Sequence, residues 1–216
     1  MMAKRFGKGN RQYSWVRWQD RNSSSKMSPT RKILLIVFSV TAIVCLLTTP
    51  LLAKEPIRTV DGIVTQVSDG DTVKLETAEG TKLKIRLYGI DAPETEKINH
   101  RTGMVSKPGQ PYGEEAYKAL KSKMLDSKVR VDIMATDRYK RMVGIVYHDS
   151  RNINLEMVKE GWAWAYREYL DRPYASEYLD AEREARTKRL SLWQQPDPQP
   201  PWEFRKLMRL RRRANN

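Results

Sequence analysis

Apolar and polar residues alternate in short segments after residue 54, which is the pattern of half-buried β-strands. The pattern predicts three strands at residues 60–67, 72–76 and 82–90, joined by an Asp-Gly turn and a Glu-Gly turn. In the third strand, apolar residues face one side while Arg86 faces the other. The three segments are therefore expected to form an antiparallel meander.

Helical spacing replaces this alternation at residues 114–125, where apolar residues recur at every fourth position on one face. Strands are again predicted at residues 129–133 and 143–147. The loop between these two strands carries three cations and a tyrosine.

Two helices are predicted near the end of the domain. Asn154 is placed to cap a short helix that ends at Gly161, and residues 174–190 form a longer helix dense in Glu and Arg. Three strands, a helix, two strands and terminal helices predict an α+β fold. The expected architecture is a five-stranded OB-type Greek-key β-barrel with about three helices, preceded by an N-terminal hydrophobic segment.

That hydrophobic segment, residues 33–53, contains no charged residue. It is just long enough to span a bilayer, while its densest apolar part has the length of a signal-peptide h-region. A cleaved signal peptide and a retained membrane anchor both stay open. Residues 1–32 are basic and rich in Ser, show no periodicity, and are expected to be disordered. If translation began at Met27, residues 1–26 would be an artefact of the assigned start.

The chain thus divides into four parts: a leader at 1–32, the hydrophobic segment at 33–53, a domain at 54–195, and a Pro-rich linker with a basic tail at 196–216. The positive residues before the hydrophobic segment predict that the domain lies outside the cytoplasmic membrane. It would be secreted or periplasmic after cleavage, or anchored in the membrane without cleavage.

The net charge of +14 is concentrated at the two ends of the chain. Residues 1–53 hold nine Lys and Arg against one acid, and residues 202–216 hold six against one, so the rest is close to neutral. The basic tail can bind phosphates non-specifically or be only a disordered, solubilising end. Any anion binding by the domain itself must be local.

Carboxylates around the third strand form the candidate catalytic centre. Asp71, Asp91 and Glu94 offer an all-oxygen ligand set, which suits Ca²⁺ or Mg²⁺ far better than zinc. Asp-Gly-Asp and Asp-Ala-Pro-Glu are also ordinary turn sequences, so neither motif is specific by itself.

Two arginines in the same domain point to phosphate chemistry. A phosphodiester under attack gains negative charge, which a metal ion together with Arg86 and Arg141 would stabilise. Glu94 would then orient or deprotonate the attacking water.

The spacing of these residues requires a bend in the chain. Arg86 and Asp91 are five residues apart, so a regular strand would place them on opposite faces. Gly89 or Ala92-Pro93 is the expected position of the bend.

Several motifs occur in a fixed order over about residues 57–195. They are Asp69-Gly-Asp-Thr72, Arg86-Leu-Tyr-Gly-Ile-Asp-Ala-Pro-Glu94, Tyr112-Gly113, Thr136-Asp-Arg-Tyr-Lys-Arg141 and Leu192-Trp193. Together they resemble the thermonuclease family typified by staphylococcal nuclease. The resemblance implies an OB-type barrel and a calcium-dependent phosphodiesterase of DNA and RNA. It also implies 5′-O–P cleavage that leaves 3′-phosphate ends.

The resemblance also assigns the metal site. Asp71 and Asp91 would be calcium ligands, the backbone carbonyl of Ala92 would be another, and Asp69 would lie nearby in support. Ala92 stands where the type member has threonine, but a carbonyl ligand does not need that side chain.

The same resemblance assigns the catalytic side chains. Glu94 would be the general base or water-orienting group, and Arg86 and Arg141 would bind the phosphate. Lys140 replaces a glycine just before Arg141, which could alter this loop if a positive φ is needed there. The residues expected to contact the nucleotide are Arg138, Tyr139 and Tyr166.

Two other functions are compatible with parts of the sequence. A non-catalytic OB module would bind single-stranded nucleic acid without cleaving it, although such modules ordinarily lose catalytic residues that this chain keeps. A membrane-anchored scaffold would use its basic tail against acidic lipids. A monomer is expected, and no specific protein partner is inferred.

Overall fold

The computed structural model describes residues 28–30 and 55–214. The chain divides into two compact units, residues 1–49 and 50–216, and the second unit holds the fold described below. The predictions for the leader and for the hydrophobic segment at 33–53 lie outside the described residues. Within the described ranges, no helix is both long enough and apolar enough to cross a membrane.

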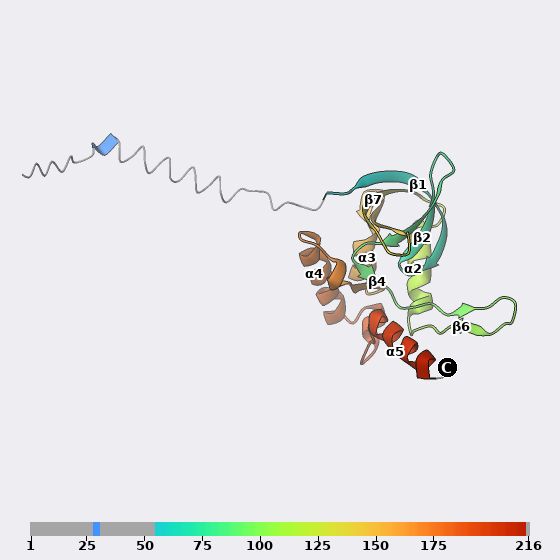
Figure 1. The fold of residues 1–216 in the computed structure, drawn as a ribbon. Coiled ribbons are helices and arrows are strands. Elements are labelled where there is room, and N and C mark those ends of the chain that lie inside the picture. The colour runs from blue at the N-terminus through green and yellow to red at the C-terminus, as the bar shows by residue number, and fades with distance from the viewer. Residues whose placement is uncertain (1–27, 31–54, 215–216) are drawn as a thin grey trace, which may run out of the picture. The chain divides into compact units, whose positions relative to one another are not determined.

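Five strands of the second unit form a closed barrel (Figure 1). They are β1 (Arg58–Asp69), β2 (Thr72–Glu76), β3 (Lys82–Leu87), β7 (Lys128–Thr136) and β8 (Met142–His148). Neighbours in the order β3-β2-β1-β7-β8 are antiparallel. A parallel pairing of β3 with β8 then closes the sheet on itself. The predicted α+β OB-type barrel is confirmed.

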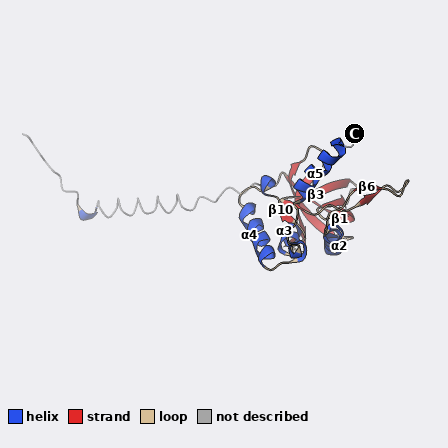
Figure 2. Cartoon of the chain, turned by 90° about the horizontal axis from the view of Figure 1, so that it is seen from below, coloured by secondary structure: helices blue, strands red, loops and turns tan. Residues whose placement is uncertain are grey.

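Short strands and helices surround the barrel (Figure 2). The short strands are β4 (Ile90–Asp91), β5 (Lys97–Ile98), β6 (Val105–Lys107), β9 (Arg151–Asn152) and β10 (Trp164–Ala165). The α-helices are α2 (Gly113–Met124), α3 (Ile153–Lys159), α4 (Tyr174–Thr187) and α5 (Pro201–Ala214). Two 3₁₀ helices, η1 (Arg167–Tyr169) and η2 (Ser191–Gln194), complete the described part.

The core fills the barrel and extends beneath α2. The alternation predicted for the strands brings one row of each to the inside, so that Val73, Leu75 and Ile85 are fully buried. The predicted apolar face of α2 packs against the same core through Ala116, Leu120 and Met124. Burial of these side chains is the main stabilisation of the barrel.

The cap of α3 differs from the prediction. Asn152, not Asn154, is the N-cap, and its side-chain oxygen accepts a hydrogen bond from the Leu155 N–H. Asn154 is fully buried, accepts from the Val146 N–H and donates to the Tyr88 and Gly144 carbonyls. A buried amide is stable only with such partners, and sequence alone did not distinguish the two asparagines.

The basic tail is not the disordered end that was one of the two forms expected for it. Residues 201–214 form α5 rather than a disordered end, so the described residues contain four α-helices where about three were expected. Pro201 begins the helix, a position where its missing N–H costs nothing. Trp202 then packs against Trp164, with ring centroids 5.6 Å apart. This aromatic contact ties the helix to the domain.

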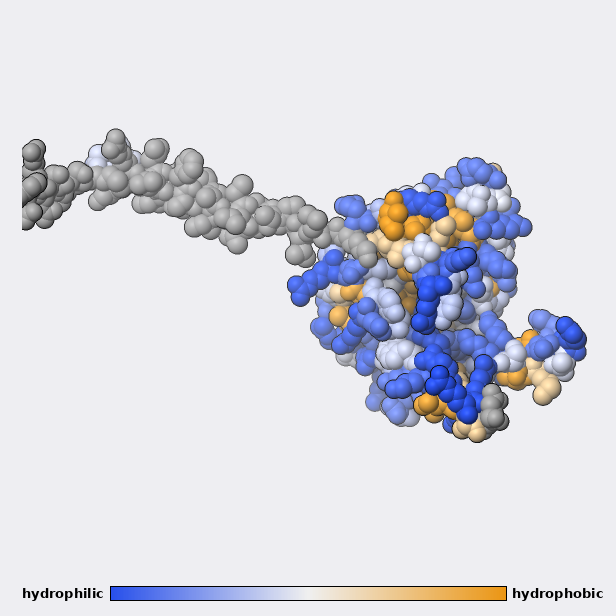
Figure 3. All heavy atoms as spheres, in the orientation of Figure 1, coloured by the Kyte–Doolittle hydropathy of each residue, from blue (hydrophilic) through white to orange (hydrophobic). Residues whose placement is uncertain are grey.

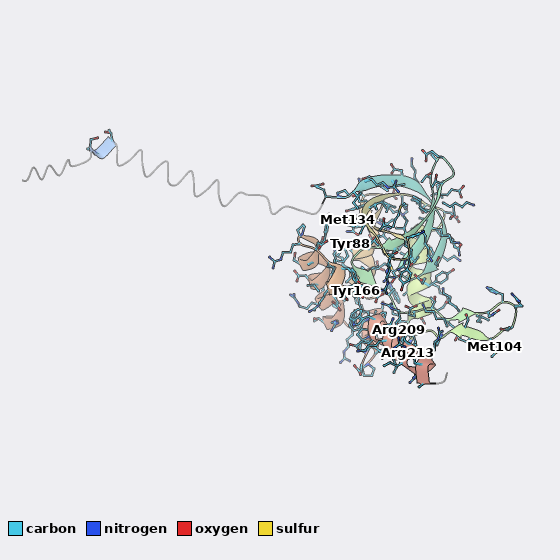
Figure 4. The ribbon with its side chains drawn as sticks, viewed as in Figure 1. Tyr88, Met104, Met134, Tyr166, Arg209 and Arg213 are labelled. Atoms are coloured by element: carbon cyan, nitrogen blue, oxygen red, sulfur yellow. The ribbon has the colours of Figure 1, made fainter. Side chains whose placement is uncertain are left out.

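Polar side chains dominate the face shown in Figure 3, and apolar ones form small patches. One patch belongs to the projecting β5–β6 hairpin, where Ile98, Met104 and Val105 are more than half exposed. Met104 is labelled at this hairpin in Figure 4. The hairpin therefore lies outside the core.

Candidate active site

Arg86 joins the two buried carboxylates that were predicted to form the site. Its Nη1 lies 2.5 Å from Asp71 Oδ1, and its Nη2 lies 2.6 Å from Asp91 Oδ1. Asp71 is 3% exposed and Asp91 is fully buried. The structure thus brings together three residues from β3, β4 and the β1–β2 turn.

A bend at Gly89 makes this meeting possible. β3 ends at Leu87, Gly89 has φ 73°, and β4 then turns away to pair with β10. Only glycine adopts a positive φ without steric cost, so of the two predicted bend positions the sharp turn falls at Gly89. The Ala92 N–H then donates to Asp71 Oδ2 at 3.1 Å, which fixes Asp91 beside Asp71.

Burial and the charges in the site shift the pKa values of its carboxylates in opposite directions. Burial alone would raise the pKa of Asp71, but the Arg86 guanidinium outweighs it and lowers that pKa to about 2. Burial and the neighbouring Asp71 raise the pKa of Asp69 to about 7. Burial also raises the pKa of Asp91, although Arg205 and Arg86 oppose it. The site is therefore a dense cluster of negative groups held by cations.

Glu94, the predicted general base, is at the edge of this cluster. Its Oε1 accepts from Arg205 Nη1 at 2.9 Å, and its Oε2 accepts from Lys107 Nζ. Its backbone N–H donates to Gln110 Oε1 at 3.1 Å. Gly113 at the start of α2 lies directly against the Glu94 carbonyl, so the backbone is held on two sides.

Arg205 on α5 belongs to the site although the sequence reasoning missed it. It contacts both oxygens of Asp91, with Nη1 3.1 Å from Oδ1 and Nη2 2.7 Å from Oδ2. Its side chain is 28% exposed. The available signal was the clustering of arginines after residue 202, which did not reveal which arginine enters the site.

Arg141 lies near the site but does not join the carboxylates. It precedes β8, whose first residue Met142 pairs with Ile85 of β3. Its Nε donates to Asp137 Oδ2 at 2.7 Å, an interaction within its own loop. Lys140 has φ 61°, so this position does need a positive φ, and the lysine adopts it. The loop thus keeps a left-handed residue before Arg141 although lysine stands in place of glycine.

The three predicted nucleotide contacts lie in two places. Arg138 and Tyr139 are in the β7–β8 loop, where Tyr139 is 65% exposed and the Arg138 guanidinium lies 4.9 Å from its ring. Tyr166 follows β10 and stacks on Trp202 of α5, with ring centroids 5.3 Å apart and planes 2° from parallel. Figure 4 labels Tyr166 close to α5. Its face is therefore covered by the helix.

The chemistry of the site fits a hard divalent cation. No group of three or more His, Cys, Asp and Glu side chains arranged to hold a metal occurs within the described residues. Asp71 and Asp91 are nevertheless held together by one guanidinium, and all donors are oxygens. Cationic nitrogens of both Arg86 and Arg205 lie on Asp91 Oδ1, which shows that this position accommodates positive charge.

Sequence comparison identifies the family. Residues 84–195 match the model of the Staphylococcal nuclease homologue family, a range that includes Arg86, Asp91 and Glu94. The chain belongs to this family. It is a hydrolase of the nuclease class, and its substrate is nucleic acid.

Individual relatives agree with this assignment. An endonuclease of Haemophilus influenzae is 36% identical over 143 residues, which are 66% of this chain and 71% of the relative. A protein of Shigella flexneri named micrococcal nuclease is 36% identical over 154 residues, 67% of this chain and 80% of the relative. An endonuclease of Escherichia coli O157:H7 is 35% identical over 147 residues, 68% and 85% of the two chains.

Proposed function

We propose that this nuclease is calcium-dependent and tolerant of sequence, and that it cleaves the 5′-O–P bond to leave 3′-phosphate ends. The observation that carries the proposal is the single Arg86 guanidinium that spans Asp71 and Asp91 beside Glu94. Calcium would be held by Asp71, Asp91 and the Ala92 carbonyl, with Asp69 in support. When bound, it would supply positive charge to the phosphate under attack.

The protein side chains divide the remaining work. Glu94 takes a proton from the water whose oxygen bonds to phosphorus; the P–O5′ bond breaks, and O5′ takes up a proton from solvent water and leaves as an alcohol. Arg86, beside both carboxylates, donates hydrogen bonds to the phosphate oxygens as they gain negative charge. Arg141 supplies a second guanidinium once it turns from Asp137 to the substrate.

Arg138, Tyr139 and Tyr166 are proposed to contact the nucleotide. The 65% exposure of Tyr139 leaves its ring available for stacking on a base. Tyr166 is available in the same way only when Trp202 leaves its ring.

A plasmid-degradation assay with the full chain tests the proposal. We expect degradation with Ca²⁺, none with excess chelator, and a rate about 10²–10⁴-fold lower for Glu94→Gln. The control is Glu115→Gln on the exposed surface of α2, which should retain the wild-type rate. Unchanged activity in Glu94→Gln would remove Glu94 from the mechanism.

The ends of the products test the position of cleavage. Cleavage of the 5′-O–P bond predicts that polynucleotide kinase labels the products directly, without prior phosphatase treatment. Products that require phosphatase before labelling would show cleavage on the other side of phosphorus. Binding without cleavage under any divalent ion would instead favour the non-catalytic OB module.

Export or membrane anchoring of the domain is proposed from the sequence of residues 33–53 alone. Mass spectrometry of the N-terminus of the protein recovered from cells tests it. A mature chain that begins near residue 54 would show cleavage, whereas a chain that keeps residues 33–53 in the membrane fraction would show an anchor.

A further inference from the structure

The α5 helix places one cation on the oxygens that the proposed chemistry needs. Arg205 contacts both carboxylate oxygens of Asp91 and one oxygen of Glu94, at 2.7 to 3.1 Å. Lys107 lies on the other oxygen of Glu94, and Arg86 shares Oδ1 of Asp91. Every side-chain oxygen of these two acids is thus engaged by a cationic nitrogen.

Contacts on both sides of Arg205 hold α5 in this position. Trp202, one turn earlier, stacks on Tyr166 and meets Trp164 edge to face. Two turns later, Arg212 Nη2 donates to the Ser106 carbonyl of the β5–β6 hairpin at 3.1 Å. In Figure 1 the helix runs from below β4 toward this hairpin, and Figure 4 labels Arg209 and Arg213 along it.

A divalent cation and this guanidinium exclude each other. Calcium ligands lie 2.3–2.6 Å from the ion, so an ion on Asp91 would occupy the lone pairs that now accept from Arg205. Like charges so close together also repel strongly in a buried site. Glu94 is equally unable to accept a proton from water while Arg205 and Lys107 hold both of its oxygens.

We propose that α5 is an inhibitory element, in which Arg205 occupies the cation position on Asp91, and holds Glu94 as well, until a divalent cation displaces it. The inference rests on the calcium dependence proposed above. Displacement frees Glu94 for the attacking water, and it releases Trp202 from the face of Tyr166. The helix thus couples cation binding to exposure of a proposed nucleotide contact.

The inference predicts the effect of Arg205 on calcium affinity. Calcium binding is measured by isothermal titration of the full chain in detergent, comparing wild type with Arg205→Gln. We expect the variant to bind calcium about tenfold more tightly. This is the gain expected if Arg205 leaves the site open in only about one wild-type molecule in ten. The control is Arg211→Gln, an exposed arginine on a different face of α5, which removes the same charge and should change the affinity little.

Hydrogen exchange reports the displacement itself. In wild type, calcium should accelerate amide exchange in residues 201–214, whereas in Arg205→Gln exchange there should already be fast without calcium. At calcium concentrations below the wild-type dissociation constant, Arg205→Gln should also degrade plasmid faster than wild type.

Each result separates the inference from the proposed function. Equal or weaker calcium binding by Arg205→Gln overturns the inference alone, as does calcium binding that leaves exchange in α5 unchanged. A lower rate of Arg205→Gln at low calcium also overturns it, and would make Arg205 a substrate-binding residue. If neither wild type nor Arg205→Gln binds calcium, both the calcium site and the inference fail.

Discussion

At the scale of single residues, Arg86 holds the candidate site together. Its guanidinium neutralises two buried carboxylates, and burial of such groups without a partner is costly. Burial would lower the pKa of Arg86, but the neighbouring carboxylates outweigh burial and raise it. The guanidinium therefore stays charged at any ordinary pH. The same side chain therefore serves stability and the proposed binding of phosphate.

Replacing Arg86 by Gln should lower the free energy of unfolding by about 3 kcal/mol in the presence of chelator, because Asp71 and Asp91 lose their shared partner. Urea denaturation followed by circular dichroism measures this change. Lys84→Gln provides the control, since Lys84 is exposed on the same face of β3 and should change stability by less than about 0.5 kcal/mol. Equal stability of Arg86→Gln and wild type would contradict the structural role of Arg86.

Lys140 is strained by its position in the β7–β8 loop. With φ 61° it adopts a left-handed conformation that costs a residue with Cβ about 1 kcal/mol. Lys140→Gly should therefore raise the free energy of unfolding by up to about 1 kcal/mol, because relief of strain exceeds the added entropy of the unfolded chain. Lys140→Ala keeps the strain and removes the charge, so thermal denaturation should place it near wild type. A destabilised Lys140→Gly would show that the lysine is not strained.

At the scale of elements, the start of α2 controls the backbone at Glu94. A Cβ on Gly113 would lie 2.2 Å from the Glu94 carbonyl oxygen, much closer than any allowed contact. Gly113→Ala must therefore push residues 94–95 away from α2, and we expect at least a tenfold loss of nuclease rate because Glu94 is displaced.

Gly103→Ala separates this effect from backbone strain. Gly103 has φ 66°, but a Cβ there meets nothing within 4 Å. This variant should lose about 1 kcal/mol of stability and keep its activity. If Gly113→Ala retained the wild-type rate in the plasmid assay, the position of Glu94 would not depend on α2.

Local patterns predicted the elements well because most of them are determined by residues close in sequence. The alternation at residues 72–76 marks β2 at its observed bounds, and the apolar spacing of α2 identifies its buried face. The choice between Asn152 and Asn154 as the cap depended instead on burial of Asn154 under Tyr88 and Gly144. Periodicity carries no information about such a tertiary contact.

At the scale of the whole molecule, the site combines residues that are far apart in sequence. Asp91 and Arg205 are separated by 114 positions, and their contact depends on the aromatic packing of Trp202. Charge counting located the basic residues of the tail but could not reveal that one of them turns inward. The motif residues around Arg86 and Asp91 were predictable because the Gly89 bend lies within the motif itself.

A link between Tyr88 and Asp171, also distant in sequence, predicts how the stability of the whole fold depends on pH. The Tyr88 hydroxyl donates to Asp171 Oδ2 at 3.2 Å and accepts from the Asp171 N–H at 2.8 Å. Burial, with a further contribution from the Asp171 carboxylate, raises the pKa of Tyr88 to about 12, above its ordinary value of 10.0.

The sign of the effect follows from proton binding. Between pH 10 and 12 the folded state keeps the Tyr88 proton while the unfolded state loses it, so the free energy of unfolding falls as pH rises. The stabilisation is fully present below pH 10, and its loss approaches about 2 to 3 kcal/mol for a two-unit shift.

The Tyr88→Phe variant has no hydroxyl to titrate at this position. Urea denaturation at several pH values should therefore show a shallower decline of its free energy of unfolding, and the decline that remains comes from other buried tyrosines such as Tyr178. Tyr139→Phe, at an exposed position, should follow wild type. An unchanged slope in Tyr88→Phe would show that this hydroxyl does not titrate differently in the folded and unfolded states.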